Sequence, residues 1–437
     1  MGHGNSRQNV DPPPVDDPHH LLDGRRVGRP AGYTPGEPVD GEIVVYFADD
    51  QRLLYQLRQW LPVFELLDRR HPVVIVTGHP ETYSALGRLT GLRAVFAPTW
   101  PDLAGLYETS AFAMAIYVNN SMYNFLSLTV PTMAHVHVNH GESDKVCMVS
   151  NQVKAYDRVF VAGEAAVLRH RAALVEFDAR KLVRVGRPQL DLQPEPVLAA
   201  LDRPTILYAP TWEGENTAND YTSVEVHGPV IVTAALAVPR VRVVYKPHPR
   251  VVSSTTPEIV EAHGRIVALV DDARRDDPDA GHRTELHSDI LAVIPRCDLM
   301  ITDVSSVGLD FLYLRVDRPI FLVDRYGDRA RLHAEAPISR CADVLDATTI
   351  GGLTATLTAR LAGDEHRAAR VEMRRHYFGD LAPGESTARF LSAVDAVLRT
   401  REELTKWTDP EHGEPDRIAA SSGSASHPTL QPQGSPA

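Results

Sequence analysis

Two histidines, each next to residues that restrict the chain, are the first candidates for chemistry in this sequence of 437 residues. His140 is followed by Gly141 and comes directly after the apolar run 134–138. An imidazole near its ordinary pKa of ~6.5 accepts a proton at neutral pH, so His140 is a candidate general base. A loop histidine beside a turn glycine is the plain alternative, and the residues alone leave it open. Lys145 ends the same segment and adds a cation.

The second histidine, His248, lies between Pro247 and Pro249, after the apolar run 241–245. The two prolines limit the freedom of this loop. Lys246 and His248 can therefore be held ready for a diphosphate at little entropic cost. A rigid exposed loop without function is the alternative interpretation.

Four polar side chains follow another apolar run, at the point where a helical pattern begins. They are Thr302, Asp303, Ser305 and Ser306, and Asp310 lies one turn into the predicted helix. Backbone N–H groups and the positive end of a helix attract phosphate groups. A helix cap needs only one such residue, so this group indicates a diphosphate site rather than a cap alone.

The segment from Tyr208 to Trp212 ends a further apolar run. Pro210 breaks the strand and leaves the hydroxyl of Thr211 and the indole of Trp212 at its tip. These groups could line a base or ribose pocket. An ordinary strand end with a core tryptophan is equally compatible with the residues.

Three histidines, His135, His137 and His140, are close to the HxHxDH zinc signature of the metallo-β-lactamase superfamily. Histidines at this spacing can bind zinc. However, Asn139 stands where that signature has Asp, and on a strand the first two side chains share one face and can simply pack. We expect no metal and no cofactor, and keep a metal-dependent hydrolase as a minor alternative.

The elements that must position these groups are short apolar runs alternating with amphipathic segments. Such alternation predicts parallel α/β sheets with helices on both faces. A single helix is expected over 53–67. The expected strands are 43–47, 73–77, 113–118 and 134–138 in the first half, and 206–209, 241–245, 299–302 and 320–323 in the second. The ends of these strands carry the four polar segments, as α/β folds require of a ligand site.

The chain therefore divides into two Rossmann-like domains that face each other across a cleft. We expect an N-terminal domain over 41–190 that carries the base and a C-terminal nucleotide domain over 203–380, with the hinge at 187–202. A helix within 381–405 is expected to pack back across the hinge. The tails 1–40 and 406–437 lack any apolar periodicity and are predicted to be disordered.

Composition narrows the class of protein. The net charge of -12 argues against a nucleic-acid partner. Cys147, Cys297 and Cys341 are too scattered for a disulfide framework or a CxxC metal site, which favours a reducing compartment. The longest nearly apolar stretch, 229–238, is about half of the ~20 residues that a membrane helix needs. We expect a protein of the cytoplasm, with a peripheral position on the inner face of the plasma membrane left open.

Taken in order, the four segments resemble the CDP-glycerol:poly(glycerophosphate) glycerophosphotransferase family, the teichoic-acid polymerase type with a GT-B fold. That family shows His-Gly-x-x-x-Lys, Tyr-Ala-Pro-Thr-Trp, Lys-x-His-Pro and Thr-Asp-x-Ser-Ser, and the resemblance covers about 130–325. The chain departs from it at Glu213, where the family often has Arg. A carboxylate there would be unfavourable beside a diphosphate unless it faces hydroxyl groups.

The resemblance implies a cell-envelope transferase that moves an alditol phosphate from a CDP-alditol to an acceptor hydroxyl of a lipid-linked or polymeric substrate, with release of CMP. By the same resemblance, His140 is the base and His248 stabilises the leaving CMP. Donor binding would fall to a group that includes a glycine and a lysine of the first segment: Gly141, Lys145, Pro210, Thr211, Trp212, Lys246, Thr302, Asp303, Ser305, Ser306 and Asp310. A GT-B glycosyltransferase and an inactive nucleotide-binding protein are the alternatives.

Overall fold

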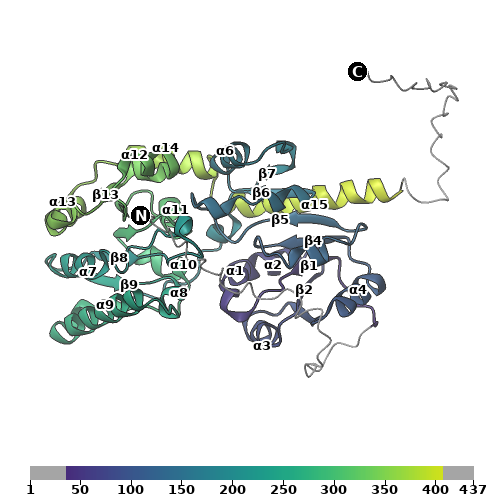
Figure 1. Ribbon diagram of the computed structural model, residues 1–437, viewed down its shortest axis with the longest axis horizontal. Helices are drawn as coiled ribbons and strands as arrows, with labels where there is room; N and C mark the ends of the chain where they lie inside the picture. Colours follow the sequence, from purple (N-terminus) through teal and green to yellow (C-terminus); the bar gives the residue numbers. More distant parts are fainter. Residues whose placement is uncertain (1–35, 407–437) are drawn as a thin grey trace, which may run out of the picture.

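The computed structural model describes residues 36–406 and contains two parallel sheets, each with helices on both faces (Figure 1). The predicted disordered tails lie outside the described residues, apart from 36–40 and Lys406. Every described strand pair is parallel. The α/β class expected from the alternating pattern is confirmed.

The first sheet has seven strands in the order β3-β2-β1-β4-β5-β6-β7. Its strands are β1 (Ile43–Tyr46), β2 (Val73–Thr77), β3 (Arg93–Phe96), β4 (Met114–Tyr117), β5 (Ala134–His137), β6 (Arg158–Val161) and β7 (Leu182–Arg184). The second sheet has six strands in the order β10-β9-β8-β11-β12-β13. Its strands are β8 (Thr205–Ala209), β9 (Arg242–Tyr245), β10 (Arg283–Thr284), β11 (Leu299–Thr302), β12 (Ile320–Val323) and β13 (Asp343–Leu345).

All eight strands named from the sequence are present, within one residue of their predicted ends. They were visible because strands buried on both faces read as continuous β-branched runs, and every residue of β2 is buried. The strands that were not named lie at or beside sheet edges. Two of them, β3 and β7, carry exposed or half-exposed residues that interrupt the apolar signal.

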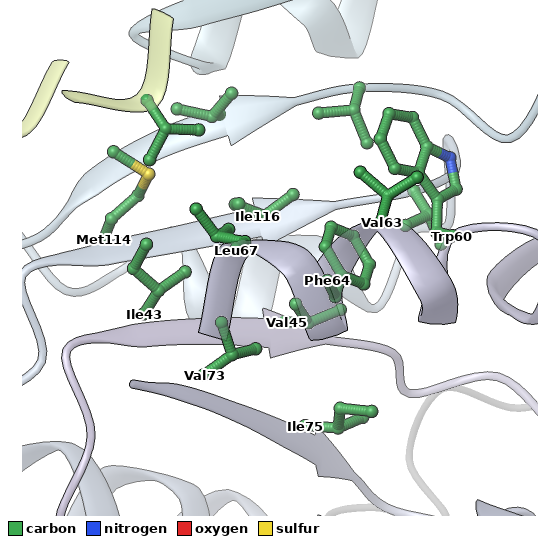
Figure 2. Close-up of a cluster of buried hydrophobic side chains, with 14 of the residues drawn as sticks. Ile43, Val45, Trp60, Val63, Phe64, Leu67, Val73, Ile75, Met114 and Ile116 are labelled. Carbon is green, nitrogen blue, oxygen red and sulfur yellow. The ribbon is translucent and has the colours of Figure 1, made fainter. Parts of the chain in front are cut away.

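The helix expected over 53–67 is wrong as a single element. The structure has a 3-10 turn at Gln51–Leu53, then α1 (Tyr55–Arg58) and α2 (Leu61–Asp68). Pro62 lies in the first turn of α2, where its missing N–H does no harm, but the same proline would break a continuous helix. Figure 2 shows the apolar side chains of α2 packed onto β1, β2 and β4.

The remaining helices cover the two sheets. In the first domain these are α3 (Pro80–Leu89), α4 (Trp100–Thr109), α5 (Asn124–Ser127) and α6 (Glu164–Ala173). In the second domain they are α7 (Gly228–Leu236), α8 (Pro249–Val252), α9 (Pro257–Asp276), α10 (Ile290–Val293), α11 (Ser306–Leu314), α12 (Arg329–Glu335), α13 (Leu353–Ala362) and α14 (Arg367–Phe378). None of the helices within 36–406 is both long enough and apolar enough to cross a membrane.

Helix α15 (Glu385–Lys406), the last one within residues 36–406, returns to the first domain after α14 has packed on the second (Figure 1). Phe390 and Val394 are fully buried in the apolar cluster of the first sheet. The Phe390 ring lies 5.4 Å from that of Trp60 and 6.0 Å from that of Phe160, between ring centroids. The chain thus crosses between the domains twice.

Gly186 lies where the first crossing begins. Its φ of +76° is one that L side chains rarely adopt, and a Cβ there would lie 2.2 Å from Ser386 Oγ. The first crossing and the first turn of α15 are therefore packed directly against each other, and only glycine fits this position.

Candidate active site

The carboxyl ends of the central strands of both sheets meet at the boundary between the domains. From the first sheet come the segments after β1 and β5, and from the second the segments after β8, β9 and β11. Several contacts join the two sets. Lys145 Nζ donates a hydrogen bond of 2.8 Å to Thr211 Oγ1, and a Cβ on Gly141 would lie 3.1 Å from Ser306 Cβ. The structure thus brings the four predicted segments together.

The loop that carries His140 is held by two hydrogen bonds to Asn139. Asn139 adopts a φ of 55°, and its side-chain oxygen accepts a 2.8 Å hydrogen bond from the N–H of His140. Its carbonyl accepts a second bond, of 2.7 Å, from the indole of Trp60. These bonds fix the backbone that carries the imidazole.

His140 and His248 flank a single ring, that of Tyr55 in α1. The ring centroids lie 6.1 Å apart for Tyr55 and His140, and 5.2 Å apart for Tyr55 and His248. Both contacts are edge-on, at 88° and 86° between the ring planes. The two histidines, which come from different domains, therefore contact the same aromatic ring.

Both imidazoles are neutral at pH 7. Burial lowers the pKa of His140 to about 4, and the positive charges of Arg187 and Lys145 add to this effect. Burial likewise lowers the pKa of His248 well below its usual value, with help from Lys145, His140, Arg250 and Lys246. A neutral histidine can accept a proton. The cations around the two histidines would stabilise a bound anionic ligand.

The loop after β9 places His248 through backbone and ring contacts. Its N–H donates to Pro210 O at 3.1 Å, and its Nδ1 accepts from the N–H of Arg250 at 3.2 Å. The acceptor role of Nδ1 leaves the proton of the neutral ring on Nε2. The ring also stacks against Trp212 at 6.1 Å, and the Arg250 guanidinium lies 3.8 Å from the Trp212 centroid.

Two lysines bring positive charge to the boundary between the domains. Lys145 and Lys246 are both more than nine-tenths buried, and burial lowers the pKa of each ammonium group. Glu285 and Asp289 partly oppose this shift at Lys246. Cations held in so little water interact strongly with any phosphate that enters.

The residues at the start of α11 divide into two kinds. Thr302 is buried and donates its hydroxyl proton to Ala209 O at 2.8 Å. Asp303 is buried and accepts from the N–H groups of Thr211 at 2.8 Å and Ser223 at 3.2 Å. Both side chains hold the loops together through these bonds, and the second carboxylate oxygen of Asp303, Oδ1, has no hydrogen-bond partner among residues 36–406. Ser305 and Ser306 are half-buried, and Ser305 makes no capping bond, so their hydroxyls are the ones suited to a phosphate.

Asp310 is paired with Arg187, which lies at the domain crossing, in a buried ion pair. Arg187 also donates to Gln59 Oε1 at 3.1 Å, and Gln59 Nε2 donates to Asp289 Oδ1 at 3.1 Å. The resemblance implies that Asp310 contacts the donor directly. The position of Asp310 instead favours its ion pair with Arg187. Its carboxylate helps to lock the domains together.

Glu213 faces hydroxyl groups, which is the condition under which a carboxylate at this position is not unfavourable. Its Oε1 accepts from Ser254 Oγ at 2.6 Å and from Thr256 Oγ1 at 3.5 Å. The carboxylate thus ties the segment after β8 to the loop before α9.

The three histidines of the zinc-like signature have separate environments. His135 uses both ring nitrogens, with Tyr117 Oη at 2.9 Å and Val130 O at 2.8 Å. His137 is buried and stacks on Tyr156, with 5.0 Å between ring centroids. Within residues 36–406 no group of three or more acidic, histidine or cysteine side chains is arranged to hold a metal ion.

Tyr55, Gln59 and Arg187 were missed by sequence reasoning. None of them belongs to a motif, and each acts through partners that are distant in the chain. The Gly-Arg-Pro sequence at the hinge was the only visible signal, and it indicated a chain crossing rather than a site.

Two α/β domains whose strand ends meet at a polar boundary define a GT-B-like fold. Solved structures share this fold. Wall teichoic acid polymerase TagF aligns over 85% of this chain and 90% of that chain, at 12% identity and a TM-score of 0.53. A putative UDP-N-acetylglucosamine 2-epimerase from Listeria monocytogenes aligns over 82% and 97%, at 12% identity and a TM-score of 0.53. A glycosyltransferase from Rickettsia africae aligns over 83% and 98%, at 11% identity and a TM-score of 0.50.

Sequence comparison gives the more specific result. Residues 132–328 match the family model of CDP-Glycerol:Poly(glycerophosphate) glycerophosphotransferase. No curated protein is a significant match to the sequence. The family match confirms the resemblance carried by the four motifs, and over these residues the chain is similar to enzymes of the glycerophosphotransferase type.

Proposed function

We propose that the protein transfers an alditol phosphate, glycerol phosphate or a close relative, from a CDP-activated donor to an acceptor hydroxyl and releases CMP. The observation that carries this proposal is the placement of His140 and His248, from opposite domains, against the same Tyr55 ring. The acceptor is a lipid-linked or polymeric chain of a teichoic-acid-like or capsular polymer. A peripheral position at the membrane would follow from such an acceptor.

His140 acts as the general base in this proposal. The acceptor oxygen attacks the β-phosphorus while its proton passes to the imidazole, and the bond to the oxygen bridging the α- and β-phosphorus breaks. A donor diphosphate beside Lys145 and Arg187 adds negative charge where those cations now lower the pKa of His140. Donor binding therefore raises the pKa of His140 and makes it a stronger base.

His248 acts on the leaving group. Since its Nδ1 accepts from Arg250 N–H, its Nε2–H is the donor that can meet the phosphate of the departing CMP. Ser305, Ser306 and the positive end of α11 bind the diphosphate, and Lys145 and Lys246 neutralise the charge that develops. Pro210, Thr211 and Trp212 border the nucleotide.

The test is nucleotide release. The protein is incubated with CDP-glycerol, CDP-ribitol, UDP-sugars and GDP-sugars, and the released nucleotide is identified. We expect CMP from a CDP-alditol, and a ~10²–10⁴-fold slower release by His140→Ala, the usual cost of losing a general base. His366→Ala removes a histidine that pairs with Asp343 in the second domain and is the matched control. Absence of CMP from every CDP donor would refute the proposal.

The same assay separates the alternatives. A glycosyltransferase would release a nucleoside diphosphate and form a glycosidic linkage instead of a phosphodiester. An inactive nucleotide-binding protein would bind a nucleotide without turnover, and His140→Ala would leave its function in vivo unchanged.

A further inference from the structure

The segment that carries His140 and Lys145 is held by residues that the sequence motifs leave unspecified. The pattern His-Gly-x-x-x-Lys leaves three positions open, and Glu142 and Asp144 occupy two of them. We call residues 139–145 the His140 loop. It contains neither helix nor strand, so its position depends on the contacts of its side chains and of the few backbone groups that are bonded.

Arg169 of α6 binds both carboxylates of this loop. Its Nη1 donates to Glu142 Oε1 at 2.7 Å, and its Nη2 donates to Asp144 Oδ1 at 3.1 Å. The side chain of Arg169 is 17% exposed, and those of Glu142 and Asp144 are 7% and 4% exposed. Ion pairs with so little water around them are stronger than pairs at the surface, and a guanidinium presents its donors in a fixed plane. Arg169 therefore fixes the loop at two points, one on each side of Ser143.

Tyr377 of α14 holds the same loop from the second domain. Its hydroxyl donates to the other carboxylate oxygen of Asp144, Oδ2, and accepts from the N–H of Ile338 at 3.1 Å. Burial raises the pKa of Asp144 to about 6, and the charge of Arg169 and the hydroxyl of Tyr377 oppose that rise. Asp144 is therefore ionised at pH 7 and has a donor for each of its oxygens.

Packing alone does not hold the loop. A cavity of about 40 Å³ borders it, and the residues that line this cavity include Gly141, Glu142 and Arg169. A cavity of this size is large enough for water, so part of the loop has no protein atoms packed against it. The polar contacts of Glu142 and Asp144 therefore carry a larger share of what fixes the loop.

Arg169 is poorly suited to bind the donor itself. Both of its terminal nitrogens are used, and its single positive charge is shared by two carboxylates. The excess negative charge of this cluster would repel a phosphate. Any effect of Arg169 on the reaction must therefore act through the loop.

We propose that Arg169 is a positioning residue, which holds the His140 loop so that the base stays in place for the acceptor hydroxyl. This inference rests on the role of His140 in the proposed function. A displacement of about 1 Å in a reacting group can cost about 100-fold in rate. A residue that touches no substrate can therefore control turnover.

The main variant is Arg169→Lys. Lysine keeps the positive charge, so the buried carboxylates retain a cation, but its single ammonium group cannot reproduce the two separate donors of the guanidinium. We expect kcat for CMP release, measured per folded protein, to fall by about 10- to 100-fold. The matched control is Arg171→Lys, the same change at an exposed arginine of α6, which should keep the wild-type kcat.

A double-variant cycle tests whether Arg169 acts through the base. In the His140→Ala background, Arg169→Lys should cause no further loss of kcat, because the group that it positions is absent. An equal loss in both backgrounds would mean that Arg169 acts independently of His140, and it would overturn the proposal.

Hydrogen exchange of the full chain, followed by mass spectrometry, measures the loop without any substrate. Arg169→Lys should increase deuterium uptake in peptides that cover 139–145 and leave the uptake of β1 unchanged, whereas Arg171→Lys should change neither. Unchanged uptake over 139–145 would show that Arg169 does not hold the loop. A rise throughout the chain would show a general loss of stability instead of a local one. Either result contradicts the positioning role.

The outcomes separate the two proposals. If the wild type releases CMP from a CDP-alditol and Arg169→Lys matches it in kcat and in exchange of the loop, the positioning role is refuted and the proposed function stands. If the wild type releases no CMP from any CDP donor, the proposed function is refuted. Exchange of the His140 loop then decides by itself whether Arg169 holds it.

Discussion

Replacing Arg187 by methionine tests whether the buried ion pair with Asp310 holds the two domains together. Arg187 is 4% exposed and Asp310 is 1% exposed, so methionine leaves a buried carboxylate without its cation. Removing one partner of a buried pair costs about 3–5 kcal/mol of unfolding free energy. We expect a loss of this size at alkaline pH.

The loss should depend on pH in a defined direction. Burial raises the pKa of Asp310 to about 7, and Arg187 opposes that rise. In the folded protein the carboxyl is therefore protonated at pH 5, whereas in the unfolded chain, with a pKa of ~3.9, it is ionised. The folded form holds one proton more, so stability falls as pH rises and levels off above the folded pKa.

Without Arg187 the folded pKa moves higher, and the fall continues beyond pH 7. Each further pH unit widens the gap between wild type and variant by about 1.4 kcal/mol, or about 2 kcal/mol between pH 7 and pH 8.5. Urea unfolding of both proteins at pH 5, 7 and 8.5 measures this gap. A gap that is equal at all three values, or smaller than about 1 kcal/mol at pH 8.5, would refute the assignment of Asp310 as a buried charge that depends on Arg187.

Two further predictions follow from the packing. Gly186→Ala introduces a methyl group at a positive φ and against the first turn of α15, so it should lower the unfolding free energy by at least about 1–3 kcal/mol. Gly363→Ala, where nothing lies within 4 Å of the new carbon, is the control, and equal melting temperatures for the two variants would contradict the prediction. Tyr55→Ala admits water between the two histidines and should move the acid limb of the pH profile of kcat/KM for CMP release to higher pH, because the base is then less buried while Lys145 and Arg187 still face it. Tyr55→Phe keeps the ring and should keep the profile, and an unchanged profile in the alanine variant would show that the ring does not shield the base.

The fold was readable from the sequence because central parallel strands are buried on both faces. Runs such as Val73–Thr77 have no competing interpretation once helical segments alternate with them. The same reasoning failed over 53–67, where the apolar spacing is helical but Pro62 permits only the start of a new helix. The apolar spacing predicted one continuous helix, whereas Pro62 predicted a break, and the structure has the break.

The site was partly readable for a related reason. His140, His248 and Ser305 follow strand ends, and strand ends of α/β sheets converge. The sequence could not tell which polar groups face the cleft and which hold the loops, as the buried bonds of Thr302 and Asp303 show. Tyr55 and Arg187 act across the domain boundary, and contacts between distant segments leave no local pattern.

The return of α15 to the first domain has a consequence for how the protein is made. Phe390 and Val394 complete an apolar cluster that begins at Ile43, so the first domain lacks part of its interior until synthesis of the chain has passed α15. Domains usually fold as units in the order of synthesis. Here the second domain, whose sheet ends at Leu345, has all its strands before the first can close. A cut between the two halves would therefore leave the first domain without α15, and completion of its interior waits for translation to reach that helix.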